Sequence, residues 1–485
     1  MAERLKSGVV RSIGSVCSGT DAPVLMYEAF DDALQEYLGN GFATMGHGFS
    51  TEVNPKKRKF LLDMYEDRMH LLFHDACLLD QNTSYDDVSG KHQIVPRVSD
   101  LVGGFPCVDV SGLNAKRKQA AATVKDGSMR TGRIFHAIMN YAKAADSKEQ
   151  YPGTIVLENV LGLCSKPTGE SDELSNFDFC VHYLEKIGYF VVSFRLCARQ
   201  FGFPVSRERV YMLAVREDIA SAAGLGPQQL QDKAVDVMSR LIVRQELTRD
   251  LDDFLLPEKH PLIQEMFRSV TAKNKPDEPS TCDAKRPRTR SARWPEIHAR
   301  RFDALGLDWW ESGVPNQQTV DTFPGLQALG LRQFEILRMH GFEFPDRKRT
   351  INLAFGMGRA RSKEAESHIV TPSSQVFLGH RCRLTHGREA LSLQALHFGP
   401  RQSRLDRYSH TFLLDLAGNA FMGLCFGAVA VVKEVLLGHC FARAVRAQMA
   451  QSIPPPWQPL HRDLPSSPFC EGVEEEDFQL TFVDQ

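Results

Sequence analysis

The chain has 485 residues, of which 42% are hydrophobic and 24% are charged. Such a composition is typical of a globular protein with a sizeable core, which excludes a disordered chain, a collagen and a coiled-coil rod. Lysines and arginines number 58 against 60 acidic residues, for a formal net charge of -2, so a nucleic-acid partner would require a local basic face.

The 11 cysteines are scattered, and no two of them are spaced as Cys-x-x-Cys. This pattern excludes a disulfide scaffold and a zinc ribbon, predicts no metal site and favours a reducing compartment. The first residues lack the apolar core of a secretory signal. Residues 417–437 form the most apolar late stretch, but Lys433 and Glu434 interrupt it, so we expect a buried helix and no membrane contact.

Short apolar runs alternate with longer amphipathic segments over residues 1–216. This alternation predicts an α/β domain in which the runs form buried strands of a parallel sheet. Ligands of such sheets bind beyond the carboxyl ends of the strands. Strands are expected at 9–16, 155–157 and 210–215, and helices at 24–38, 55–69 and 132–144.

The pattern changes after residue 216. Residues 228–256 are predicted to be helical, and the polar segment 271–301 is broken by four prolines. Its core at 284–293, AKRPRTRSAR, carries five positive charges and no acidic residue, which fits a solvated loop and also a nuclear-import or nucleic-acid-contacting patch. The tail at 451–485 is predicted to be a disordered, acidic extension.

Residues 100–114, DLVGGFPCVDVSGLN, place the thiol of Cys107 on a tight turn after an apolar strand. A cysteine there acts as a nucleophile if a neighbouring positive field lowers its pKa, whereas most lone cysteines are packing residues. The Pro-Cys-x-x-Cys zinc site of deaminases is excluded because Val110 stands at the second cysteine position.

Two further polar segments flank predicted strands. Glu158 follows the hydrophobic run in TIVLENVLGL (154–163), where burial would raise the carboxyl pKa and suit proton transfer; a capping or hydrogen-bonding role is the alternative. Arg207 and Arg209 alternate ahead of the strand at 210–215, so either both face one site and bind an anion or a carbonyl, or both are ordinary exposed charges.

The order Pro-Cys, then Glu-Asn-Val, then Arg-x-Arg before a strand is more specific than any one part, and in this order the chain resembles the cytosine-C5 DNA methyltransferase family. Six further segments resemble motifs of that family in the family's order, so the resemblance covers roughly residues 9–437. They are IGSVCSGTDAP (13–23), HGFSTEVNP (47–55), FHDA (73–76), TGRIF (131–135), RCRLTHGREALSLQALHF (381–398) and LAGNAFMGL (416–424).

The resemblance implies a cytosine-5 methyltransferase that acts on a base flipped out of duplex DNA. Cys107 would be the nucleophile that adds to cytosine C6, and Glu158 would hydrogen-bond or protonate N3. Arg209, together with Arg207, would hold the carbonyl of the base and orient the active-site groups.

The same resemblance assigns the walls of the base pocket to Asn159 and Pro106. The segment after the cysteine, 111–130, resembles the mobile loop that closes over the extruded base. Its basic side chains include Lys116, Arg117, Lys118 and Lys125.

The cofactor implied by the resemblance is S-adenosylmethionine. Gly19 would allow close approach of the backbone to its methionine part, and Glu52 would accept hydrogen bonds from the ribose. Asp75 would contact the adenine amino group, and Asn419 would lie near the methionine end. Taken singly, such residues are often exposed acids or helix caps. The full set of expected cofactor residues is Cys17, Ser18, Gly19, Thr20, Glu52, Val53, Asp75, Ala76, Asn419 and Ala420.

Three departures from the family pattern bear on these expectations. Val205 stands where the family has a glutamine before Arg-x-Arg. The first loop has Cys17 and Thr-Asp-Ala at 20–22 in place of an aromatic residue and a second glycine, and the last motif has Ala-Phe at 420–421. They concern cofactor affinity and support of the active-site loop, and none removes a group that performs the chemistry.

The implied fold is α/β: a Rossmann-like class I methyltransferase mixed sheet with a smaller target-recognition domain. Residues 1–216 and 405–450 would form the cofactor-binding domain and 217–404 the recognition domain, with double-stranded DNA in the cleft between them. Two alternatives are a catalytically silent relative that binds DNA or a partner enzyme, and a transfer-RNA cytosine-5 methyltransferase, whose Cys-Phe-Thr signature is missing from 217–380. We expect a nuclear protein, because of segment 284–293, with targeting by the recognition segment, by the basic stretch or by a protein partner.

Overall fold

In this computed structural model, the described residues are 11–38, 45–66, 68–112, 114, 122–144, 150–166, 174–243, 247–273, 294–306, 317–356, 359–368 and 370–449. The basic segment 284–293, the tail 451–485 and residues 116–118 of the expected mobile loop lie outside them, so the roles assigned to these segments stay predictions.

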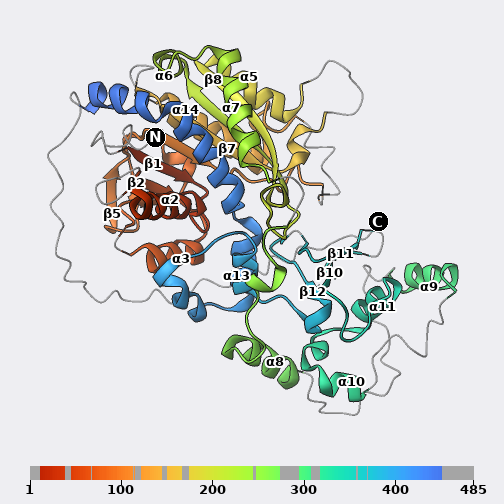
Figure 1. The fold of residues 1–485 in the computed structure, drawn as a ribbon. Helices are drawn as coiled ribbons and strands as arrows, with labels where there is room; N and C mark the ends of the chain where they lie inside the picture. The colour runs from red at the N-terminus through yellow and green to blue at the C-terminus, as the bar shows by residue number, and fades with distance from the viewer. Residues whose placement is uncertain are drawn as a thin grey trace.

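A nine-stranded mixed sheet forms the centre of the larger part of the molecule (Figure 1). Its strand order is β5-β4-β3-β2-β1-β6-β7-β9-β8, with β1 parallel to β2 and β6, and β6 parallel to β7. β9 runs antiparallel to both β7 and β8. The bounds are β1 Ser12–Val16, β2 Gly46–Thr51, β3 Leu72–Phe73, β4 Thr83–Asp86, β5 Lys91–Ile94, β6 Asp100–Gly103, β7 Thr154–Asn159, β8 Tyr189–Cys197 and β9 Glu208–Arg216.

The three strands expected from the apolar runs are present as β1, β7 and β9, but the sheet is mixed and not parallel throughout. The segment 198–207 between β8 and β9 is short, and parallel neighbours need a crossover of about a dozen residues or more, so these two strands pair antiparallel. The order β3-β2-β1-β6-β7-β9-β8, with β9 as the reversed strand, is the Rossmann-like class I methyltransferase arrangement that the resemblance implied.

Helices cover both faces of the large sheet, so each strand supplies alternate side chains to two separate cores. On β9, Tyr211 and Leu213 enter one core, and Val210 and Met212 enter the other. The first face is covered by α2, α3, α6, α7 and α14, and the second by α4 and α5 (Figure 1). Their bounds are α2 Ala22–Leu38, α3 Pro55–Tyr65, α4 Met129–Lys143, α5 Asn176–Lys186, α6 Glu217–Ala222, α7 Pro227–Leu241 and α14 Gly423–Met449.

The last helix, α14, packs against α2, α6 and α7 although it carries two charges within its apolar sequence. Lys433 and Glu434 are 1% and 4% exposed. Arg11 donates to Glu434 over 2.6 Å and to Asp100 over 3.2 Å, and Lys433 pairs with Asp100, so each buried charge has an opposite partner. The stretch His410–Leu437 is long and apolar enough to cross a membrane, but 72% of its most apolar window is buried inside the protein, as in a core helix.

The helical segment after β9 packs on the large sheet, not with the smaller part to which the sequence assigned it. α6 and α7 enter the first core, and α7 lies against β8 and α14. The helix expected over 228–256 ends at Leu241, and Leu251–Phe254 forms only a 3-10 turn. Between them the Thr248 N–H donates to Gly202 O over 2.9 Å, a tertiary contact that a local pattern does not reveal.

A four-stranded antiparallel sheet with its own core forms the smaller part of the molecule, in the order β11-β10-β12-β13 (Figure 1). The division into a cofactor-binding and a recognition domain stays a prediction. The bounds of the remaining elements are α8 Pro261–Lys273, α9 Trp294–Ala304, α10 Gln317–Thr322, α11 Leu331–Met339, β10 Arg349–Asn352, β11 Ser362–Glu364, β12 Val376–Leu378, β13 Arg383–Leu384, α12 Gly387–Ser392 and α13 His410–Asn419.

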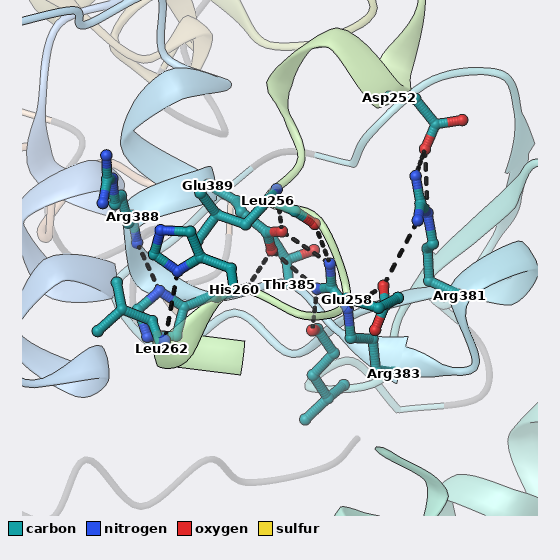
Figure 2. A network of polar contacts seen from close by, with 12 residues as sticks. Asp252, Leu256, Glu258, His260, Leu262, Arg381, Arg383, Thr385, Arg388 and Glu389 are labelled. Atoms are coloured by element: carbon teal, nitrogen blue, oxygen red, sulfur yellow. Dashed lines mark hydrogen bonds and ion pairs between the residues drawn. The ribbon is translucent and has the colours of Figure 1, made fainter. Parts of the chain in front are cut away.

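A network of ion pairs connects residues 250–258 to β13 and α12 (Figure 2). The fully buried Arg383 side chain forms a bidentate pair with Glu389 at 2.8 and 2.9 Å, and its Nε donates to Glu258 over 2.9 Å. Glu389 also accepts the backbone N–H groups of Leu256 and His386. We refer to this network as the Arg383 joint, because it fixes how the chain passes from the large sheet to the smaller one.

Candidate active site

Three polar segments meet at the edge of the large sheet where β6 and β7 end and β9 begins. Cys107 lies on the turn after β6, Glu158 and Asn159 close β7, and Arg209 is the second residue of β9. Because β9 is antiparallel to β7, its first residues pair with the last residues of β7, and Glu158 lies opposite Tyr211. Motifs that are more than a hundred residues apart in the sequence thus share one edge, which we call the catalytic edge.

The turn that carries Cys107 is tied to its neighbours through backbone carbonyls. Asn159 Nδ2 donates to Phe105 O over 3.0 Å, and Thr131 Oγ1 donates to Pro106 O over 2.7 Å. Cys107 itself is partly exposed. Asn159 and the carbonyl of Pro106 therefore hold the turn against β7 and α4, and their expected role as pocket walls stays a prediction.

Glu158 forms an ion pair with Arg209, whose Nε lies 3.1 Å from Glu158 Oε1. The two side chains are 12% and 11% exposed, and Oε1 accepts no well-aligned hydrogen bond from the described residues. Burial raises the pKa of Glu158, against the opposing charges of Arg209 and Arg207. A carboxyl in this setting takes up a proton more readily than an exposed one, as proton transfer to a base requires.

Arg207 has a different set of partners from Arg209. Its terminal nitrogens donate to three backbone carbonyls, those of Val370 (2.6 Å), Gly418 (3.2 Å) and Ala420 (2.8 Å). Burial and the charge of Arg209 lower the pKa of Arg207 to about 9. The expectation that Arg207 holds a base carbonyl does not fit this arrangement, because backbone carbonyls already accept hydrogen bonds from both of its terminal nitrogens. The same role for Arg209 stays a prediction.

The charges at the catalytic edge act on the thiol in opposite directions. Burial and the carboxylate of Glu158 raise the pKa of Cys107, while Arg209 and Arg207 lower it. The net shift is upward, so the thiol is protonated in the free protein at neutral pH. Protonation of Glu158 would remove the opposing negative charge and leave both arginines acting on the thiol. The two groups are therefore coupled, and a proton taken up by Glu158 favours a thiolate at Cys107.

A second cluster of expected residues lies where β1 and β2 end. The loop after β1 places Cys17, Gly19 and Asp21 at positive φ angles of 59°, 53° and 52°. Glu52, 8% exposed at the end of β2, accepts Gly19 N–H over 3.0 Å and Asn54 N–H over 2.8 Å. Its carboxylate thereby fixes the loop and keeps lone pairs for a ligand.

Other expected cofactor residues lie in the same loop or after the neighbouring strands. Ser18 and Thr20 are buried within the loop, while Val53 next to Glu52 is 73% exposed. Asp75 follows β3 and caps the 3-10 helix Ala76–Leu78 by accepting Cys77 N–H over 2.9 Å, and Ala76 is buried beneath it.

Asn419 and Ala420 lie at the end of α13, close to the catalytic edge. Asn419 Nδ2 donates to Asp415 Oδ1 over 2.9 Å within its own helix, and Ala420 presents its carbonyl to Arg207. The chain then enters α14, where a Cβ on Gly423 would meet Met26 Sδ of α2 at 3.1 Å. Arg207 and this packing bring the last motif against both the catalytic edge and the helix that follows the first loop.

Sequence reasoning missed the residues that support these clusters. Thr131 donates its backbone N–H to the Asp109 carboxylate over 2.8 Å, which ties α4 to the cysteine turn. Both residues stand inside segments noted above, TGRIF and DLVGGFPCVDVSGLN, but a motif shows spacing and not contacts. His47 and Ser50, on β2, form a hydrogen-bonded chain that ends at Asp21.

Residues 38–304 match the family model of C-5 cytosine-specific DNA methylases. The chain is 26% identical over 444 residues to the DNA (cytosine-5-)-methyltransferase DMT5 of Cryptococcus neoformans var. grubii serotype A. The matched region covers 88% of this chain and 17% of that protein. The chain is 23% identical over 486 residues to DMT5 of Verticillium dahliae, with 87% and 19% covered. The structure of the S. pombe Dnmt2 methyltransferase matches 88% of this chain and 99% of its own, at 12% identity and a TM-score of 0.46.

The chain spans less than a fifth of the length of the two DMT5 proteins, whereas they cover most of the chain. The match to the family model takes in more than half of the 485 residues and includes the cysteine turn, Glu158 and both arginines. The chain belongs to the C-5 cytosine-specific DNA methylase family.

Proposed function

We propose that the protein is a DNA cytosine-5 methyltransferase that transfers a methyl group from S-adenosylmethionine to C5 of a cytosine flipped out of duplex DNA. The observation that carries the proposal is the meeting of Cys107, Glu158 and Arg209 at one edge of the sheet, with Arg209 Nε 3.1 Å from Glu158 Oε1. A binding module has no physical need for a thiol beside a carboxyl whose pKa is raised. Family membership supports the same reaction.

Cytosine is a poor electrophile, so its ring must be activated before C5 can accept a methyl group. The Cys107 thiolate adds to C6 and forms an S–C6 bond, while Glu158 gives a proton to N3 and offsets the charge that enters the ring. Arg209 holds the carbonyl of the base and orients Glu158. When bound, the cofactor supplies the electrophilic methyl group to C5. The C5 proton then passes to water, the S–C6 bond breaks with its electron pair returning to Cys107 as a thiolate, and N3 gives its proton back to Glu158.

The cluster at the ends of β1 and β2 fits the cofactor. Glu52 keeps lone pairs for ribose hydroxyls, and the exposed Val53 offers an apolar wall for an adenine ring. A Cβ on Gly19 would meet no atom of the described chain closer than 4.0 Å, so the backbone there is open to the methionine part. Asp75, after the next strand β3, is an acceptor for the adenine amino group.

The smaller sheet and its helices would then contact the DNA duplex as the recognition part. This proposal rests on the resemblance, which puts these residues between the motifs at 131–135 and 381–398. The basic segment 284–293, outside the described residues, would add positive charge for DNA contact or for nuclear import, and nuclear location is proposed on the same ground.

Methyl transfer from labelled S-adenosylmethionine tests the proposal, with unmethylated duplex DNA and transfer RNA as parallel substrates and Cys107→Ser as the matched control. We expect label in DNA with the native chain and none with the variant. Label in transfer RNA alone would reject DNA as the substrate. Binding of DNA and cofactor without transfer would favour the silent relative. A bisulfite map of the methylated DNA would identify the target cytosines.

A further inference from the structure

The turn from β1 into α2 contains a buried acid that the proposed chemistry does not use. Asp21 belongs to the Thr-Asp-Ala stretch at 20–22 that stands in place of the second glycine of the family loop, and the residue is 0% exposed. Its φ of 52° lies in the left-handed region, which Asp and Asn tolerate better than most other residues with a side chain. The chain therefore keeps the backbone conformation of a glycine loop and adds a carboxyl beneath it.

Asp21 accepts the last hydrogen bond of a chain that begins at His70. The His70 backbone N–H donates to His47 Nδ1 over 3.1 Å, which leaves the proton of the neutral imidazole on Nε2. His47 Nε2 lies 2.8 Å from Ser50 Oγ, and the Ser50 hydroxyl donates to Asp21 Oδ2. Burial lowers the pKa of His47 to about 3, with a further lowering by His70, so the ring stays neutral. Every donor in this chain therefore points toward Asp21.

The other oxygen of the carboxyl, Oδ1, is buried and accepts no hydrogen bond from any described residue. An ionised carboxylate with one unsolvated oxygen is unfavourable. Burial accordingly raises the pKa of Asp21 to about 7, although the hydroxyl groups of Ser50 and Ser15 lower it. At physiological pH the carboxyl thus lies between its neutral and ionised forms.

The charged and titratable groups around Asp21 do not hold it ionised. Glu28 of α2 raises its pKa further. The Tyr65 hydroxyl of α3 donates to the backbone carbonyls of Thr20 and Asp21, at 2.7 and 3.2 Å, and not to the carboxylate. Arg401 lies over the Tyr65 ring and pairs with Glu28. Within the described chain, Asp21 has no ion-pair partner, so a cation would have to come from a ligand.

We propose that Asp21 is a charge-balancing residue of the cofactor loop, partly protonated in the free protein near neutral pH and ionised when the sulfonium cation of S-adenosylmethionine binds, so that the chain prefers this cofactor to its product. The inference rests on the proposed function, which assigns the methionine part of the cofactor to residues 17–20. On binding, the O–H bond of the carboxyl breaks and the proton passes to bulk water, while Ser50 continues to donate to the carboxylate. S-Adenosylhomocysteine has no positive charge at sulfur and leaves the protonation of Asp21 unchanged.

Calorimetry in two buffers of different ionisation enthalpy measures the protons released on binding and tests this directly. At pH 7 the native chain should release roughly 0.4 proton more than Asp21→Asn when S-adenosylmethionine binds. The two proteins should release equal numbers with S-adenosylhomocysteine. The preference can be measured as the Kd of S-adenosylhomocysteine divided by the Kd of S-adenosylmethionine. Between pH 6 and 8 this ratio should rise about 5-fold more in the native chain than in Asp21→Asn.

Asn keeps the acceptor for Ser50 and tolerates the positive φ, so Asp21→Asn is expected to fold. Asp32→Asn removes an exposed acid from α2, the helix that follows Asp21, and is the matched control, which should behave as the native chain. Thermal unfolding without ligand gives a second readout. In the folded protein the pKa of Asp21 is about 7, above its ordinary value of 3.8. The protonated carboxyl therefore makes its full contribution to stability below pH 3.8, and this contribution is lost as the pH rises through about 7. The Tm of Asp21→Asn should therefore exceed that of the native chain by more at pH 8 than at pH 5.

Equal proton release by the native chain and Asp21→Asn, with both ligands bound, would overturn the inference and leave the proposed function intact. Parallel Tm curves across this pH range would overturn it as well, because Asp21 would then not titrate. Failure of the native chain to bind S-adenosylmethionine at all would instead reject the proposed function.

Discussion

Two buried arginines, Arg383 and Arg207, are surrounded in opposite ways. Arg383 donates to two carboxylates, those of Glu389 and Glu258, over 2.8 to 2.9 Å. Arg207 forms no ion pair within the described residues, and its terminal nitrogens bind three backbone carbonyls. Carboxylates that pair with a cation cancel most of its electrostatic field in the surroundings. Neutral backbone carbonyls leave most of that field in place. Arg383 therefore stabilises a joint, while Arg207 acts on the thiol of Cys107.

The carboxylates of the two regions differ in the same sense. Glu389 accepts hydrogen bonds from Arg383 and from the backbone of Leu256 and His386. Glu158 has Arg209 as its ion-pair partner and a raised pKa caused by burial. Fully paired charges fix structure, and partly paired charges keep a proton available for chemistry. Four predictions test this distinction.

The largest effect is expected for Cys107→Ser at the catalytic edge. A serine hydroxyl does not form an oxyanion near neutral pH, so methyl transfer should fall by more than about 1000-fold, while DNA binding is retained. The rate is measured with labelled cofactor, and DNA binding by fluorescence anisotropy. Near-normal turnover would mean that another group is the nucleophile.

Arg383→Met should instead damage stability at the Arg383 joint. It leaves the Glu389 carboxylate buried without its bidentate partner, which should lower the free energy of unfolding by about 3 to 5 kcal/mol. Urea unfolding followed by circular dichroism measures this change. The double variant Arg383→Met, Glu389→Leu should recover part of the loss, since no buried charge is left unpaired. A stable single variant would show that the joint is not a stabilising network.

Arg207→Met and Arg207→Lys separate the charge of Arg207 from its hydrogen bonds. Both lose bonds to the carbonyls of Val370, Gly418 and Ala420, but only Met removes the positive charge that lowers the pKa of Cys107. The ascending limb of the kcat/KM profile against pH should move to higher pH in the Met variant and stay in place in the Lys variant. We expect a loss of activity of roughly 10- to 100-fold for Met at pH 7. Identical profiles for the two variants would show that the charge does not reach the thiol.

The smallest effect is expected for Lys348→Ala at the outer rim of the Arg383 joint. Lys348 pairs with Asp250 and Asp252 at 2.7 and 2.9 Å, but its side chain is 40% exposed. Exposed ion pairs contribute little, so Tm should change by less than about 2 °C and activity should not change. A large loss of stability would show that the exposed ion pairs of Lys348, and not the buried pairs of Arg383, stabilise the joint.

The amino-acid sequence by itself determined the main strands of the large sheet and the order of the catalytic motifs. Strands covered on both faces by helices are continuous apolar runs, and a motif such as Pro106-Cys107 is contiguous, so both are visible in one dimension. The helix expected over 228–256 was wrong at its end, because the chain leaves α7 to reach Gly202, which is far away in the sequence.

Only the tertiary structure decided what Arg207 and Asp21 do. The carbonyls that Arg207 binds at Val370 and Ala420 are 163 and 213 residues away in the sequence, so no local spacing predicts them. In the sequence, Asp21 is only a departure from a glycine loop. In the structure, Ser50 of β2 and Tyr65 of α3 enclose it. The physical reason is the same for both residues. A side chain's charge state and partners depend on desolvation and on groups brought near it by folding, and these are properties of the packed molecule.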